Sequence, residues 1–181
     1  LGLSFDNPPA GVETATIVPA GIYDQGGLVL DPATESQNTP TFFDQLSPTL
    51  VITSSPAVEE GLIPDTANFE IKPEPEEPLR NSEGSETISA EDLQSQITFA
   101  YQDGEQETIA YDVDINSQNT IITITPDSLM DEWRLVQVTF ASGFLDTADN
   151  VAGGATATFQ TRDRTYPTMT ENPSLDPANT A

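Results

Sequence analysis

The chain has 181 residues, of which 30 are acidic and five are basic, giving a formal net charge of −25. A surface this acidic repels nucleic-acid phosphates and anionic bilayers, so we expect neither as a partner. The sequence has no cysteine and no histidine, which excludes disulfides, thiolate nucleophiles, imidazole bases and the usual zinc, copper and haem ligands. We therefore expect a protein that is not a conventional enzyme.

Hydrophobic residues make up 36% of the chain, and its 15 prolines and 11 glycines are spread along it. This composition favours many short strands joined by turns. No run of about 18 apolar residues is present, so we expect no direct insertion into a membrane. The chain begins with Leu1 and not with methionine, from which we expect an exported, processed chain or a piece of a longer one, and a secreted, extracellular or cell-surface location.

Three regions follow one another along the chain. Residues 1–46 place turn signals between short apolar runs and have no helical period, which predicts an N-terminal arm or a small β-extension. Residues 47–162 carry the β-sandwich pattern described next. Residues 163–181 contain few large apolar side chains, as is typical of a linker or of a tail that becomes ordered on assembly.

The central region alternates apolar and polar residues with a period of two. Seven segments are rich in β-branched and aromatic residues and are separated by turn signals such as Asp103-Gly104. This recurrence predicts an all-β fold, an immunoglobulin-like antiparallel β-sandwich with an extended N-terminal arm and a C-terminal tail. The predicted strands lie within residues 50–53, 67–71, 96–101, 108–115, 120–124, 135–140 and 155–159.

Two stretches carry the sequence signature of a helix start. A third stretch, rich in proline, disfavours both a helix and a central strand. Residues 89–93 begin with an N-cap serine followed three residues later by an acid, and residues 127–132 follow a proline and predict a single turn. The alternate prolines of residues 72–78 predict an exposed excursion. We expect the large apolar side chains to form the core and not a ligand platform; they are Phe99, Tyr101, Tyr111, Ile122, Ile124, Trp133, Val136, Val138, Phe140 and Phe159.

Three separated signatures carry a resemblance to a known family. They are PTLVITSSP at residues 48–56, NTIITITP at residues 119–126, and FLDTADN at residues 144–150 followed by ATFQT at residues 157–161. Residues 47–161 resemble the bacterial Ig-like domains of the S-layer type, which recur in S-layer proteins, adhesins and other secreted surface proteins. The last strand pair of that family typically encloses an Asp-x-Ala-Gly-Asn turn, and here Asp149 stands where glycine is usual. The resemblance implies a sandwich architecture and a surface location.

The turn between the last two predicted strands holds a candidate calcium site. Asp146, Asp149 and Asn150 offer hard oxygen ligands closely spaced on one turn, which is the chemistry that calcium prefers. The alternative is that Asp146 and Asn150 hydrogen-bond the backbone of the turn, as Asx residues commonly do. Calcium is the one cofactor that the sequence suggests.

Four residues are candidates for contacts between subunits. Leu3 and Phe5 lie in the N-terminal arm, and Arg162 and Arg164 follow the last strand and are two of the five basic residues. The arginines could pair with acids of a neighbouring subunit, because Arg–carboxylate contacts specify register. The alternative is that they screen the acidic surface of their own chain.

Three functions from different classes are compatible with these features. The first is a structural subunit or module of a bacterial surface filament, sheath or S-layer, a homo-oligomer or polymer whose terminal arms add strands to neighbouring sandwiches. The second is an adhesin or carbohydrate-binding stalk module of a larger secreted protein, with surface glycans as partners. The third is an accessory domain of a hydrolase.

Overall fold

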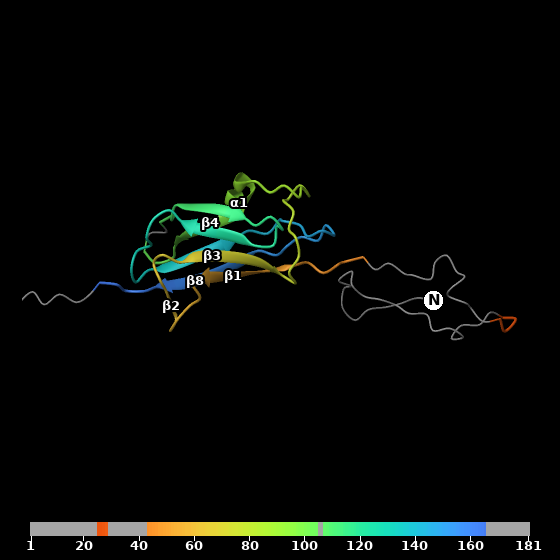
Figure 1. Ribbon diagram of the computed structural model, residues 1–181, viewed down its shortest axis with the longest axis horizontal. Helices are drawn as coiled ribbons and strands as arrows, with labels where there is room; N and C mark the ends of the chain where they lie inside the picture. Colours follow the sequence, from red (N-terminus) through yellow and green to blue (C-terminus); the bar gives the residue numbers. More distant parts are fainter. Residues whose placement is uncertain (1–24, 29–42, 105–106, 166–181) are drawn as a thin grey trace, which may run out of the picture.

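The computed structural model describes residues 25–28, 43–104 and 107–165, and it shows two four-stranded sheets packed face to face (Figure 1). One sheet has the order β1-β3-β6-β5 and the other the order β2-β8-β7-β4. The elements are β1 (Thr49–Ser55), β2 (Leu62–Ile63), β3 (Asn68–Glu74), α1 (Ala90–Gln96), β4 (Ile97–Tyr101), β5 (Tyr111–Ile115), β6 (Ile122–Pro126), β7 (Leu135–Phe140) and β8 (Ala155–Thr161).

The strand order is that of an immunoglobulin-like sandwich. All paired strands are antiparallel except β2, which pairs in parallel with the last strand, β8. The first-sheet order matches the A-B-E-D arrangement of the immunoglobulin fold, and β4, β7 and β8 match its C, F and G strands. The predicted all-β, immunoglobulin-like sandwich is therefore confirmed, while residues 1–24 and 29–42 of the predicted arm and the tail after residue 165 lie outside the described residues.

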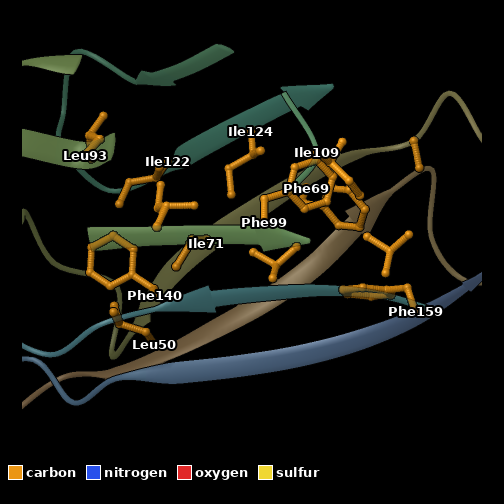
Figure 2. Close-up of a cluster of buried hydrophobic side chains, with 14 of the residues drawn as sticks. Leu50, Phe69, Ile71, Leu93, Phe99, Ile109, Ile122, Ile124, Phe140 and Phe159 are labelled. Carbon is orange, nitrogen blue, oxygen red and sulfur yellow. The ribbon is translucent and has the colours of Figure 1, made fainter. Parts of the chain in front are cut away.

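Buried and more exposed side chains alternate along the strands, and the buried ones form the core between the sheets. In β3, Phe69 and Ile71 are fully buried, whereas Glu70 between them is partly exposed. Phe69 packs against Phe99 of the opposite sheet at 5.3 Å between ring centroids and against Phe159 at 5.0 Å (Figure 2). Such edge-to-face and tilted arrangements are the favoured ones for aromatic pairs. The predicted core is therefore largely observed.

Trp133 is an exception to the predicted core, because 59% of its surface is exposed. It lies two residues before β7 begins, so the alternation of that strand does not extend to it. Its φ of 56° places it in the left-handed region, which is rare for a bulky residue and is found in turns. The expectation that it points inward was wrong.

One expectation about local structure was wrong, and another was wrong in part. Residues 127–132 form no helix, because their amides are used by tertiary partners: Met130 N donates to Asp65 O at 3.0 Å, and Asp131 N donates to the Tyr101 hydroxyl at 2.6 Å. The predicted excursion of residues 72–78 begins later than expected: residues 72–74 belong to the central strand β3 in spite of Pro73, whereas residues 75–78 lie outside any strand and are mostly exposed. The proline is tolerated because β6 pairs only with residues 69–71, so no ladder donor is needed at Pro73 on that side.

The helix α1 confirms the predicted N-cap. The Ser89 side chain accepts a hydrogen bond from Asp92 N at 3.1 Å, and the Asp92 carboxylate accepts one from Ser89 N at 2.8 Å. This reciprocal capping box satisfies two amides that a helix end otherwise leaves unpaired. Leu93 is the one residue of α1 that is buried. Within the described part of the chain, no helix has the length and apolar character to cross a membrane.

Candidate functional site

Three carboxylates from distant parts of the sequence meet at one end of the sandwich. Asp44 precedes β1, Glu77 follows β3, and Asp146 lies in the connection between β7 and β8. One oxygen atom from each carboxylate lies within 4.8 Å of the other two. We call these three residues the carboxylate cluster. Figure 1 shows that the segment before β1 enters the sandwich at this end.

Asp146 is the fully buried member of the cluster and organises the turn around it. Its Oδ1 atom accepts hydrogen bonds from Ala148 N at 2.7 Å and from Asn150 N at 2.8 Å. Its Oδ2 atom accepts one from Asn150 Nδ2 at 2.8 Å. Asp146 and Asn150 therefore make the Asx-type contacts that were the alternative to calcium binding, and Asp146 also contributes an oxygen to the cluster.

Asp149 takes a different position from the one that a shared calcium shell would give it. Its carboxylate forms an ion pair with Arg80 NH2 at 2.5 Å, and its side chain is 75% exposed. Arg80 also donates to Asp146 O, from Nε at 2.8 Å and from NH2 at 2.6 Å. The φ of Asp149 is 71°, the left-handed conformation that glycine adopts without steric cost and that aspartate visits more readily than most residues.

Glu77 has the most strongly perturbed electrostatic environment of the cluster. Its Oε1 atom is buried and has no hydrogen-bond partner. Burial, followed by the negative charges of Asp146 and Asp44, raises the pKa of Glu77 to about 7. Among the described residues, no basic side chain forms an ion pair with any member of the cluster. The cluster is thus suited to hold either a shared proton or a cation.

Sequence reasoning found one of the three members of this cluster. Asp146 stood in a recognisable turn motif, but Glu77 lay in an acidic run that was interpreted as exposed, and Asp44 lay at the end of the predicted arm. The three residues are brought together only by the closure of the sandwich. No local pattern in the sequence could have indicated their proximity.

The structure describes two of the four residues that were predicted to contact a neighbouring subunit. Arg162 NH2 pairs with Glu59 at 3.1 Å, and Arg164 NH1 pairs with the buried carboxylate of Asp65 at 2.8 Å. Both arginines therefore make contacts within their own chain, the alternative considered for them. Leu3 and Phe5 lie outside the described residues, so their role in subunit contacts stays a prediction.

The outer edge of β1 is a second feature with functional potential. In an antiparallel pair, every second residue turns its amide and carbonyl away from the partner strand. The register with β3 places Leu50 opposite Pro73, which has no amide hydrogen, and places Ile52 opposite Ile71. Leu50, Ile52 and Ser54 therefore direct their backbone groups toward the outer edge, with which no strand of the described residues pairs.

Comparison with known proteins gives little beyond these observations. No family model matches the sequence, and no curated protein matches it. Two solved structures are similar, the N-terminal part of the bacterial S-layer protein SbsC and the S-layer protein rSbsC(31-844), each with 16% identity and a TM-score of 0.44. They cover 65% and 68% of this chain, which in turn spans only 24% and 14% of theirs.

Proposed function

We propose that the chain is an extracellular structural protein, a self-assembling subunit or module of a bacterial surface filament, sheath or S-layer. In this proposal, a terminal arm of one subunit adds a strand to the sandwich of the next, and the chain has no catalytic role. The observation that carries the proposal is the open edge of β1. The resemblance of residues 47–161 to bacterial Ig-like domains of the S-layer type supports the surface location.

The β1 edge differs from the other three sheet edges. It is seven residues long and uncharged, with the sequence TLVITSS, which has high β-propensity. Strand β5 carries two exposed aspartates, which are a protective device for an edge and which β1 lacks. Strand β4 is flanked by a bridge between Ala100 and Thr108, and β2 has only two residues. An added strand therefore fits best at β1.

Backbone pairing is also the mode of association that suits the charge of this chain. All five basic residues form ion pairs with acids of their own chain. Two copies, each with a net charge of −25, therefore have no unpaired basic side chain to offer one another. Main-chain hydrogen bonds do not depend on charge complementarity, and salt or divalent cations would screen the repulsion that remains.

Negative-stain electron microscopy of the purified chain over a range of concentrations, with and without millimolar calcium, tests the proposal. We expect ordered filaments or lattices at high concentration. Dispersed monomers under every condition would contradict self-assembly of this chain.

A proline at the β1 edge tests the mechanism. Ile52→Pro removes an outward amide without removing a hydrogen bond to β3, so we expect it to stop assembly while the sandwich still unfolds cooperatively in a thermal melt. Val113→Pro is the matched control, because it removes an outward amide from β5, at the other edge of the same sheet. Assembly that is lost equally in both variants would argue against β1 as the acceptor.

One observation favours the alternative of an adhesin or carbohydrate-binding module. Trp133 is exposed, and an exposed indole ring is a common platform for sugars and other apolar faces. A glycan array with the native chain and with Trp133→Ala tests this alternative. Binding that the substitution abolishes would favour the adhesin, and the absence of any glycan signal would remove it.

A further inference from the structure

We propose that the carboxylate cluster of Asp44, Glu77 and Asp146 binds a calcium ion that fastens the segment before β1 to the end of the sandwich. The ligand set differs from the one that the turn motif suggested, since Asp149 is engaged by Arg80. The inference is independent of self-assembly, because the site lies within one chain.

The spacing of the cluster fits a single cation. Calcium binds oxygen ligands at about 2.4 Å, so two oxygens on opposite sides of one ion are at most about 4.8 Å apart. One oxygen from each of the three carboxylates lies within 4.8 Å of the others. Small shifts of the Asp44 and Glu77 side chains, which are not fully buried, are therefore enough to bring all three into one shell.

A buried atom without a partner points to a ligand at this position. Glu77 Oε1 is inaccessible to solvent and receives no hydrogen bond. Asp146 beside it has no exposed surface at all. Holding a fully buried carboxylate and a buried carboxylate oxygen side by side without a compensating charge is costly, and no basic side chain of the described residues pairs with any of the three. A divalent cation removes this cost and supplies the partner that Glu77 lacks.

The chemistry of the ligands selects calcium among the common divalent ions. All three are hard carboxylate oxygens, and the chain has no cysteine or histidine with which to favour zinc. Magnesium binds at about 2.1 Å in strict octahedral geometry and keeps several of its waters, for which a cluster built around a fully buried aspartate offers little room. Calcium accepts irregular shells that backbone carbonyls and water complete.

The position of Asp44 gives the ion a mechanical role. Asp44 lies five residues before β1, in a segment with no secondary structure. Two hydrogen bonds involve Asp44: its Oδ1 atom accepts from Leu46 N at 2.9 Å, and its main-chain O accepts from Asn150 Nδ2 at 3.3 Å. A cation shared with Glu77 and Asp146 would fix the direction in which the chain enters the sandwich.

Isothermal titration calorimetry of the monomeric 181-residue chain with calcium chloride tests the inference, with magnesium chloride as the comparator. We expect one saturable calcium site per chain and weaker binding of magnesium. Glu77→Gln should weaken calcium binding about tenfold or more, because it removes a charged ligand. Glu76→Gln is the matched control: it changes the net charge equally at an exposed neighbour and should bind calcium as the native chain does.

Hydrogen exchange of the peptide that contains residues 43–48 gives a second readout. Calcium should slow exchange there in the native chain and in Glu76→Gln, but not in Glu77→Gln or Asp44→Asn. A native chain that binds no calcium up to about 10 mM, beyond the usual range of extracellular modules, would overturn the inference. Equal affinity loss in Glu76→Gln and Glu77→Gln would do so too, because it would indicate diffuse attraction to an acidic surface.

Discussion

Ionisation of Glu77 opposes folding when no cation is bound. Its pKa is raised from 4.5 to about 7 in the folded chain. Between these two values, the folded chain keeps a proton that the unfolded chain has lost, so the free energy of unfolding falls as the pH rises. The contribution of Glu77 is therefore neutral below about pH 4.5 and fully destabilising above about pH 7.

Replacement of Glu77 by glutamine should remove this pH dependence. In buffer with a chelator, we expect Glu77→Gln to raise the free energy of unfolding at pH 8 by about 1–2 kcal/mol, a figure reduced for partial exposure, and to leave it unchanged at pH 4.5. Urea denaturation at both pH values measures the effect. Glu76→Gln serves as the exposed control, and an equal gain in that variant would assign the effect to net charge.

Arg80 and Asp149 form one ion pair but should differ widely in their contribution to stability. Arg80 also donates twice to the main-chain carbonyl of Asp146, whereas Asp149 is mostly exposed. We expect Arg80→Gln to lower the free energy of unfolding by about 2–3 kcal/mol and Asp149→Asn by less than about 0.5 kcal/mol. Chemical denaturation of the two variants checks this, and equal losses would show that the ion pair itself is the stabilising contact.

Single residues were the least predictable level of this molecule. The turn around Asp146 was recognisable from its sequence, but the partners Asp44, Glu77 and Arg80 come from other parts of the chain and are chosen by tertiary structure. Trp133 was misplaced for a related reason, because strand alternation was extended beyond the residue at which β7 begins.

At the scale of elements, local patterns were sufficient wherever a strand had its own alternation. All seven predicted strands overlap an observed one. The strand that was missed, β2, consists of Leu62 and Ile63 and exists because Ile63 is buried against β8, which is a long-range cause. The predicted turn at residues 127–132 failed because tertiary hydrogen bonds replaced the helical ones.

The capping box of α1 provides a prediction at this scale. The helix has seven residues and one buried side chain, so packing supports it weakly and the cap matters more. We expect Ser89→Ala to lower the free energy of unfolding by about 1 kcal/mol. Thermal denaturation measures the loss, and Ser95→Ala, within the same helix, should cost less. A larger loss for Ser95→Ala would show that the cap is not the main support of α1.

For the whole molecule, the dominant property is uncompensated negative charge. The chain has 25 more acidic than basic residues, and all five basic residues are already engaged in ion pairs. Raising sodium chloride from about 0.01 M to about 1 M shortens the Debye length from about 30 Å to about 3 Å and screens this repulsion. We expect the melting temperature to rise by about 3 °C, equivalent to about 1 kcal/mol. A fall would mean that the ion pairs outweigh the repulsion.

The placement of the first and last strands has a consequence for a chain under tension. The chain enters β1 at one end of the sandwich and leaves β8 at the other (Figure 1). A force that pulls these two ends apart would run along the strands, while the hydrogen bonds between β1 and β3 lie across it. These bonds would then be loaded together in shear and not opened one after another, which is the geometry of a module that resists stretching.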